Sequence, residues 1–367
     1  MKKLKKILII VQRSNGDVFL SIGLIKSIFK FYNSPQIDLL VNDDTFQMAS
    51  LLPHVSNILT FSYVKKTDNR WLQEREIFTK IFRKYDLSIN LTSSDRSVLY
   101  AIISGKKTIS VVEKDPKKSW WKKLCLSKFY FYDSSQHILK QNLSPLALLG
   151  IDHDLTQHKV QISQETIEGV KVKLSKKGIK NFIIFHPSAQ YSYKIFPKES
   201  RDILLKLLNN LGMPIIISGS NGLIDTEIKL NLPSLSNIFD FIGETSLEEY
   251  FALSHLSDAY IGMDTLNMHI AASQNKRIFA IFGPTNLRMW SPWSNELKIS
   301  AKVDMPLQTY SNNTIFQADM PCVACGLAGC DDKHQKSECL YNIRPISIFN
   351  EVEGWLKKLS IKKNEEL

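Results

Sequence analysis

Asp264 and Thr265 stand where a strand-like apolar run (258–264) ends and a helix-like stretch that carries His269 begins. An Asp or Thr at a helix start accepts hydrogen bonds from backbone N–H groups that have no helical partner, so helix capping alone accounts for both residues. A chemical role is the alternative, because ligands of open α/β sheets bind beyond the carboxyl ends of the strands and helix N-termini bind phosphate. The stretch therefore predicts either a helix cap or a phosphate site.

A second carboxylate, Asp17, follows Gly16 at the first expected strand-to-helix turn. Gly16 permits a tight turn or the close approach of a ligand. Asp17 is then either an N-cap or a general base at the carboxyl end of a strand. The turn lacks the spacing G-x-G-x-x-G, which disfavours a dinucleotide-binding first half.

Two further stretches follow expected strand ends in the second half. FHPSAQYSYKIFPKE (185–199) contains the hydroxyl of Ser188 and the ammonium of Lys194. A lysine on such a loop can neutralise phosphate charge, although a lone lysine is more often a solvated surface residue. IFGPTNLRMWSPW (281–293) contains a Gly-Pro turn and two tryptophans, for which rigid packing is a sufficient explanation.

Four of the five cysteines lie close together near the C-terminus. Cys322 and Cys325 have the spacing of a zinc-binding pair, and four thiolates form a structural zinc set. The gaps to Cys330 and Cys339 are not those of a standard zinc ribbon, and His334 could replace one ligand. A structural zinc, an iron–sulfur cluster and free or oxidisable thiols all remain open.

The elements that must position these residues alternate between short apolar runs and longer amphipathic stretches. The first series comprises strand-like runs at 6–11, 37–41, 57–61, 86–91 and 108–112, with helix-like stretches at 18–31 and 71–85. The second comprises strand-like runs at 181–188, 213–220, 237–243, 258–264 and 277–285, with helix-like stretches at 197–211, 222–230, 246–255 and 266–274. Such alternation predicts an α/β fold with parallel sheets.

A polar stretch (152–180) separates the two series, so the chain is expected to form two Rossmann-like domains. We place them at 1–165 and 166–345. The remaining segment, 346–367, contains an amphipathic helix that we expect to pack back on the first domain.

The net charge of +11 is confined to the first half of the chain. Residues 1–150 contain 24 Lys and Arg against 12 Asp and Glu, whereas the remainder contains 23 against 24. This excess indicates an acidic partner such as a phosphorylated glycan, an anionic membrane or a nucleic acid, with solubility alone as the alternative. No apolar run approaches the roughly 18 residues that span a bilayer, and the first one is too short for a signal peptide, so a cytoplasmic location is expected.

Four stretches, in this order, resemble glycosyltransferase family 9, the lipopolysaccharide heptosyltransferases: SNGDVFLSIGLIKSI, FHPSAQYSYKIFP, GMDTLNMHIAA and IFGPTNLRMWSPW. The pair Asp-Thr-x-x-x-His and Phe-Gly-Pro-Thr is specific in combination. The resemblance implies a GT-B fold, in which two Rossmann-like domains face each other across a cleft. It also implies an inverting, metal-independent transfer of a sugar, typically heptose from ADP-heptose, to the growing inner core of lipopolysaccharide.

The resemblance also assigns roles to residues. Asp17 matches the catalytic base, and Lys194 matches the lysine that stabilises the leaving phosphate. An acid near the nucleoside could be Asp225 or Glu227, of which Glu227 is our candidate. The other implied donor-binding residues are Ser188, Asp264, Thr265, Met268 and His269.

The acceptor side departs from the family pattern. Asn90 stands where the family often has an acid, whereas Ser94 and Arg96 are retained. The expected acceptor is a phosphorylated lipid-linked glycan, reached from the anionic cytoplasmic face of the inner membrane. Candidates for its phosphates, each otherwise an ordinary surface charge, are Arg96, Lys65, Lys66 and Arg70.

Other functions remain possible on the sequence alone. A sugar-nucleotide epimerase of GT-B shape would need no acceptor, and a family 9 enzyme could transfer a sugar other than heptose. A nucleic-acid binder has only the charge in its favour, since no basic motif with interleaved aromatics is present, so no nucleic-acid partner is expected. No cofactor is expected for the transfer, and a zinc ion would be structural.

Overall fold

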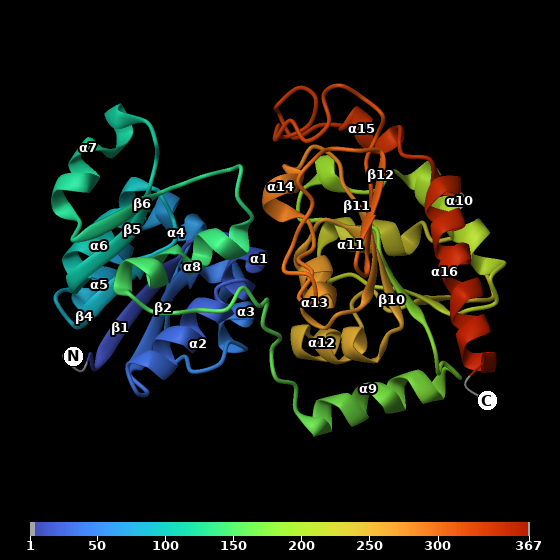
Figure 1. Cartoon of the computed structure of the whole chain (residues 1–367), viewed down its shortest axis with the longest axis horizontal. Coiled ribbons are helices and arrows are strands. Elements are labelled where there is room, and N and C mark those ends of the chain that lie inside the picture. Colours follow the sequence, from blue (N-terminus) through green and yellow to red (C-terminus); the bar gives the residue numbers. More distant parts are fainter. Residues whose placement is uncertain (1–3, 366–367) are drawn as a thin grey trace. The chain divides into compact units, whose positions relative to one another are not determined.

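A computed structural model of the chain describes residues 4–365. The chain forms two compact units that divide between Gln161 and Ile162, whereas the sequence placed the boundary at 165–166. Each unit contains one largely parallel sheet flanked by helices, as the sequence predicts for Rossmann-like domains (Figure 1).

The first unit is built on a six-stranded, all-parallel sheet with the order β3-β2-β1-β4-β5-β6. Its strands are β1 (Lys6–Val11), β2 (Gln36–Asn42), β3 (Asn57–Phe61), β4 (Tyr85–Asn90), β5 (Gly105–Val112) and β6 (Lys128–Phe131). Its helices are α1 (Asn15–Phe19), α2 (Ile22–Phe31), α3 (Phe46–Ser50), α4 (Tyr63–Asp68), α5 (Arg70–Ile81), α6 (Asp95–Ser104), α7 (Pro116–Cys125) and α8 (Ile138–Leu149). Helices cover both faces of such a sheet, which explains why its central strands are apolar along their length rather than alternating.

The helix expected over 18–31 is divided into α1 and α2. The break falls at Ser21, whose hydroxyl and backbone N–H both donate to the carbonyl of Val18. Hydrogen bonds from residue i+3 to residue i close a turn, and here they end α1 before α2 begins.

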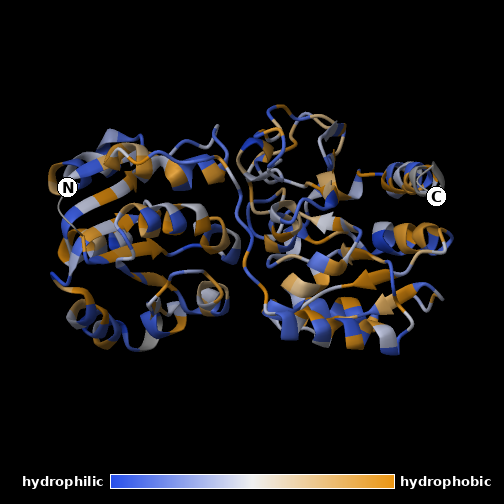
Figure 2. Ribbon diagram, turned by 60° about the horizontal axis from the view of Figure 1, so that its bottom comes forward, coloured by the Kyte–Doolittle hydropathy of each residue, from blue (hydrophilic) through white to orange (hydrophobic). Residues whose placement is uncertain are grey.

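The second unit has a seven-stranded sheet with the order β12-β13-β11-β10-β7-β8-β9, in which only β12 is antiparallel to its neighbour. Its strands are β7 (Ile183–His186), β8 (Ile215–Ile217), β9 (Ile238–Asp240), β10 (Ala259–Met263), β11 (Arg277–Ile281), β12 (Leu307–Tyr310) and β13 (Asn313–Phe316). Its helices are α9 (Gln164–Lys176), α10 (Lys198–Asn209), α11 (Leu223–Leu230), α12 (Leu247–Leu256), α13 (Leu266–Ser273), α14 (Leu287–Trp290), α15 (Glu338–Tyr341) and α16 (Pro345–Glu365). Figure 2 shows hydrophobic residues along the strands and a mixture of hydrophobic and hydrophilic residues along the helices.

Helix α16 belongs to the second unit, so the prediction that the C-terminal helix packs on the first domain is wrong. It packs against α10 of its own unit and buries Ile348 and Val352 in that unit's core. Trp355 continues the same stripe and lies edge-on to Phe279 of β11, with 5.9 Å between ring centroids. The apolar spacing correctly predicts a helix with one buried face, but spacing alone does not specify the surface that this face covers.

Within the described residues, no helix is both long enough and apolar enough to cross a lipid bilayer.

Candidate functional site

Both sheets reverse their strand order at their first strand. In the first unit the chain passes from β1 outward to β2 and β3, and then returns to place β4 on the other side of β1. In the second unit β7 holds the same position between β8 and β10. Open α/β proteins bind ligands at the carboxyl end of the sheet beside such a reversal. The residues that follow β1, β7 and β10 are therefore the first candidates for a ligand site.

Asp17 lies beyond the end of β1, in the first turn of α1, and its side chain is only about 5% exposed. The N-cap of α1 is Ser14, so Asp17 lies inside the helix and not at its cap. One carboxylate oxygen pairs with Nε of Arg13 at 2.8 Å, and the other accepts a hydrogen bond from the Ser14 hydroxyl at 2.7 Å. The two contacts hold the carboxylate in one orientation, and sequence analysis had not identified Arg13 as its partner.

In the second unit, Lys194 and Asp264 meet across the reversal point. Lys194 ends a short 3₁₀ turn after β7, and Asp264 follows β10 directly. The Lys194 ammonium lies 3.3 Å from Oδ2 of Asp264; the Asp264 side chain is 3% exposed and that of Lys194 is 23% exposed. The pair therefore places a partly solvated cation beside a nearly buried carboxylate at the carboxyl edge of the sheet.

Gly262 makes the close approach of these two strands possible. It pairs in register with His186, and a Cβ atom at this position would lie 2.4 Å from the His186 carbonyl oxygen. Its φ of +155° also lies outside the range that side-chain-bearing residues readily adopt. The glycine before Met263 and Asp264 is thus required by the pairing of β10 with β7.

The remaining predicted donor residues lie along the same edge. Ser188 is buried just after β7, and Thr265 is the N-cap of α13, although its hydroxyl makes no capping hydrogen bond. Met268 and His269 are buried within α13, and the imidazole of His269 lies 6.3 Å from the ring centroid of Trp290. Thr265, Met268 and His269 thus belong to the cap and first half of α13, and Ser188 follows the strand that pairs with β10.

The two acids of α11 lie in different environments. Asp225 is buried and accepts hydrogen bonds from the backbone N–H and the hydroxyl of Ser220, just beyond β8. Glu227 is exposed to solvent, because residues two apart on a helix point in different directions. The geometry favours Asp225 as the acid at this strand end, and the assignment to Glu227 stays a prediction without support from its position.

His186, the last residue of β7, is a buried imidazole that sequence analysis did not single out. Its Nδ1 lies 2.9 Å from the carbonyl oxygen of Ser218 and donates a hydrogen bond to it. Burial lowers the pKa of His186, and the nearby charge of Asp225 opposes this shift. A neutral histidine therefore connects the ends of β7 and β8.

Two of the four basic acceptor candidates of the first unit lie against aromatic rings. The guanidinium of Arg96 lies 3.6 Å from the ring centroid of Phe61 and donates to the Tyr63 hydroxyl at 3.1 Å. The ammonium of Lys66 lies 5.9 Å from the same Tyr63 ring, whereas Lys65 is simply exposed. Arg70 is exposed at the start of α5. Stacking on an aromatic ring orients a guanidinium while leaving hydrogen-bond donors at its edge.

Asn90, which replaces the expected acid, has a structural role. Its amide nitrogen donates to the Thr92 carbonyl and to the Ser110 hydroxyl, and its oxygen accepts from the Thr92 N–H. A carboxylate could accept but not donate, so an ionised Asp would lose the donated bonds at this fully buried position.

The metal site predicted at the cysteine segment stays a prediction. Within residues 4–365, no group of three or more His, Cys, Asp or Glu side chains is placed to hold a metal ion. Cys322, Cys325 and Cys330 are exposed, whereas Cys339 lies in the core of the second unit. Burial, reinforced by the neighbouring cysteines, raises the pKa of Cys339 to about 11. The segment thus contains three exposed thiols and one buried thiol, and the three exposed ones lie near enough to Cys339 to act on its charge.

The same segment is attached to the loops that carry the donor candidates. The Gly326 N–H donates to the carbonyl of Pro284 at 2.7 Å, and the Ser192 hydroxyl donates to the carbonyl of His334 at 2.8 Å. The imidazole of His334 also lies within 6 Å of the rings of Tyr191 and Tyr193, just before Lys194.

Comparisons with known proteins agree with this architecture. Residues 75–317 match the profile of glycosyltransferase family 9 (heptosyltransferase). Lipopolysaccharide heptosyltransferase 3 of Escherichia coli is 24% identical over 293 residues, which cover 78% of this chain and 85% of that protein.

Two solved structures share the fold over nearly the whole chain. The E. coli ADP-heptose lps heptosyltransferase II matches with a TM-score of 0.70 at 18% identity, covering 97% of this chain and 99% of that one. The E. coli heptosyltransferase WaaC with ADP-2-deoxy-2-fluoro heptose matches with a TM-score of 0.67 at 14% identity, covering 95% and 99%. These likenesses confirm the predicted GT-B class, while the cleft expected between the domains stays a prediction.

The buried His186 predicts a specific pH dependence of stability. Its pKa is lowered in the folded state, so below about pH 6.5 the unfolded chain binds a proton that the folded chain does not, and the free energy of unfolding falls as the pH falls. When the free energy of unfolding is measured in urea between pH 7.5 and pH 5, it should fall less steeply with falling pH for His186→Gln than for the unsubstituted protein. The difference should not exceed about 1.4 kcal/mol per pH unit. Parallel curves would show that His186 does not titrate differently in the two states.

The cysteine geometry predicts two classes of thiol. In the native protein, the exposed Cys322, Cys325 and Cys330 should react rapidly with a thiol reagent, whereas Cys339 should react slowly because it is buried and its pKa is raised. Elemental analysis of protein purified without chelator provides the complementary measurement. About one zinc per chain, with all four thiols protected, would contradict the two classes of thiol and support the zinc predicted from the spacing.

Proposed function

The chain belongs to glycosyltransferase family 9 and is a glycosyltransferase, and from this premise we propose that it transfers a heptose from ADP-heptose to the inner core of lipopolysaccharide with inversion at the anomeric carbon. The observation that carries the proposal is the Lys194–Asp264 pair at the reversal point of the second sheet. A cation beside the N-terminus of α13 suits a diphosphate, because both stabilise negative charge.

On the donor side, Lys194 binds the diphosphate and stabilises the charge that develops on the leaving ADP. Asp264 is an anion and disfavours phosphate, so its role is to accept hydrogen bonds from the hydroxyls of the sugar. Ser188 and Thr265 supply hydroxyls at the same edge. The other proposed donor residues, on the helix behind them, are Met268 and His269.

On the acceptor side, Asp17 is the general base. Its carboxylate takes the proton of the acceptor hydroxyl while that oxygen forms a bond to the anomeric carbon, and the bond from this carbon to the phosphate oxygen of ADP breaks. Attack opposite the leaving group inverts the anomeric configuration. Arg13 and Ser14 hold the carboxylate in place.

The phosphates of the acceptor are assigned to the basic side chains on the loops and helices after β3 and β4. Arg96 is the best oriented of them, because it is already stacked on Phe61. The other proposed contacts are Lys65, Lys66 and Arg70. The acceptor is a phosphorylated lipid-linked glycan, so we also propose a cytoplasmic protein that contacts the inner membrane peripherally.

Two alternatives remain distinguishable by experiment. A sugar-nucleotide epimerase would convert its donor without an acceptor, whereas a transferase releases ADP in proportion to glycosylated product. A family 9 enzyme for another sugar would show the same acceptor dependence with a different donor. We propose that no metal ion takes part in the transfer, because Asp17 and Lys194 provide the base and the cation that it needs.

Asp17→Asn should lower turnover by about 10²-fold or more, because the amide cannot take the proton from the acceptor hydroxyl. Donor affinity, measured by calorimetry with ADP, should stay within about twofold, since Asp17 is assigned to the acceptor. Near-normal turnover of this variant would remove Asp17 from the mechanism.

Lys194→Ala should weaken the binding of ADP-heptose and also slow the chemical step, because the lysine acts on both the bound and the leaving diphosphate. Lys198→Ala is the matched control, since Lys198 is a nearby exposed lysine whose partner is Asp202. Isothermal calorimetry and single-turnover rates measure the two effects. Equal donor affinities of the two variants would refute the placement of the diphosphate.

A further inference from the structure

Helix α7 (Pro116–Cys125) presents two unlike faces. Toward the sheet, Trp121 packs against a small core of the first unit that contains Val98, Val112 and Leu126. On the outward face, Trp120 and Leu124 are 60% and 79% exposed. These two residues are four apart in the helix, so they lie next to each other on one surface. A helix of a globular domain normally exposes polar residues there, so this face needs an explanation.

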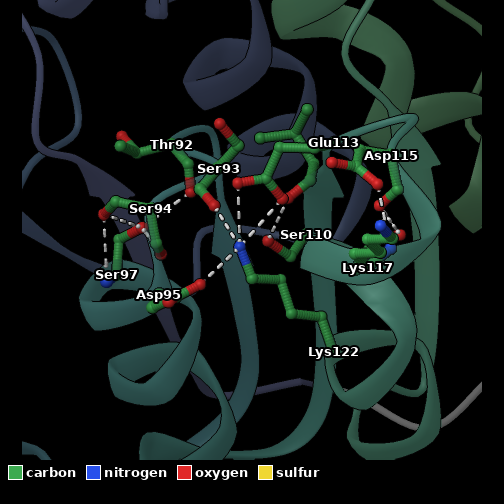
Figure 3. Close-up of polar contacts among 12 residues, drawn as sticks. Thr92, Ser93, Ser94, Asp95, Ser97, Ser110, Glu113, Asp115, Lys117 and Lys122 are labelled. Carbon is green, nitrogen blue, oxygen red and sulfur yellow. Dashed lines mark hydrogen bonds and ion pairs between the residues drawn. The ribbon is translucent and has the colours of Figure 1, made fainter.

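The helix is fixed to its unit by Lys122, the only lysine among those of α7 that is completely buried. Its ammonium lies 2.8 Å from Oδ1 of Asp95 and 2.8 Å from Oε2 of Glu113, and it donates to the carbonyl of Ser93 at 2.7 Å (Figure 3). Ser93 and Glu113 lie in the connections after β4 and β5, and Asp95 is the first residue of α6. Removing one partner from such a buried charge is costly, so α7 cannot readily rotate to bury its outward face.

The outward face continues onto the neighbouring edge strand. Phe131 at the end of β6 is 44% exposed, and the ammonium of Lys123 lies 5.0 Å from its ring centroid. We call Trp120, Leu124 and Phe131, with the lysines that adjoin them, the α7–β6 patch. Lys117 and Lys123 are each three residues from Trp120 and so lie beside it, and Lys118 lies on the flank of the helix that also carries Trp121.

Among the described residues, three lysines of the patch lack a carboxylate partner of their own, because Asp95 and Glu113, which line a hollow with Lys117 and Lys118, are paired with Lys122. Within the described part of the chain, Lys117, Lys118 and Lys123 form no salt bridge, although the chain has other lysines that do. The patch also lies in the half of the chain that holds twice as many basic as acidic residues. Exposed tryptophan and leucine flanked by unpaired lysines match the surface of an anionic bilayer, whose phosphates attract lysine and whose interface accommodates tryptophan.

We propose that the α7–β6 patch docks the protein on an anionic lipid surface, with Trp120 and Leu124 at the boundary between headgroups and acyl chains and the lysines on lipid phosphates. The inference rests on the proposed function in one respect, because that function requires an acceptor carried by a membrane. It adds the surface of the molecule that makes the contact.

The charge component is tested by flotation of the full-length protein with vesicles of phosphatidylcholine containing 30% phosphatidylglycerol. Lys117→Gln with Lys118→Gln should weaken binding about 30-fold, which corresponds to about 1 kcal/mol for each lysine near the surface. Lys176→Gln with Lys180→Gln, which removes the same charge from exposed positions of the second unit, should stay within about twofold. Equal loss in the two double variants, or equal binding to pure phosphatidylcholine vesicles, would overturn the proposal.

The apolar component has its own matched pair. Leu124→Ser should weaken binding about fivefold or more, because a largely exposed leucine loses its insertion into the interface. Leu230→Ser changes a leucine of nearly equal exposure, 81%, on α11 of the second unit and should leave binding unchanged. Indistinguishable effects of Leu124→Ser and Leu230→Ser would overturn the assignment of this face.

Failure of the docking surface and failure of the proposed function give different results. Vesicle binding needs neither donor nor acceptor, whereas transfer to a soluble, delipidated acceptor needs no membrane. We expect the patch variants to lose vesicle binding while keeping kcat with the soluble acceptor. If the protein transfers heptose but does not bind vesicles, the docking surface alone is overturned. The same holds if α7 binds a nucleic acid or a protein instead of vesicles. Vesicle binding without any transfer would overturn the proposed function and leave the patch in place.

Discussion

In each sheet, the first strand pairs in parallel with the strand that returns beside it. This pairing determines where the side chains of the candidate site lie. In the second unit, β10 pairs with β7 in parallel, so the connections that follow them leave from the same edge of the sheet. Lys194 and Asp264 are distant in the sequence and come within 3.3 Å for this reason. The requirement is strict enough to exclude a side chain at Gly262, where a Cβ atom would collide with the His186 carbonyl. The first unit repeats the arrangement, with Asp17 beyond β1.

The sequence was informative wherever one short pattern decides one local structure. Apolar runs separated by amphipathic stretches predicted both parallel sheets, and polar residues after those runs predicted most side chains at the strand ends. It was uninformative where the outcome depends on which distant surfaces meet. The stripe through Ile348 and Val352 is equally suited to any apolar surface, and only the assembled second unit shows that α10 provides it. Asp225 and Glu227 are similar in sequence, and their helix phase separates a buried acid from an exposed one.

Two lysines illustrate how the number of partners distinguishes a structural lysine from one that can bind a ligand. Lys122 has no exposed surface and is surrounded by two carboxylates and a carbonyl, so its ammonium is fully satisfied and fixes a helix. Lys194 keeps part of its surface in solvent and has a single carboxylate partner at a longer distance. A cation held so loosely can exchange its partner for a ligand, whereas Lys122 could do so only by uncovering two other charges. Sequence analysis recognised Lys194 by its place on a loop after a strand, whereas nothing in the sequence around Lys122 indicates that this lysine is buried.

The segment between β13 and α15 has a consequence for the way this protein can diverge. It contains almost no regular structure, so beyond Ala318, Met320 and Val323, which pack in the core of the second unit, its length and composition can change with little effect on the sheet. Yet several attachments of its exposed part fall on Pro284, on Ser192 and on the aromatic rings just before Lys194. Insertions or substitutions there are transmitted to the loops beside the strand ends while the scaffold remains untouched. Selection can therefore retune these loops through a tolerant insertion, at little cost to folding.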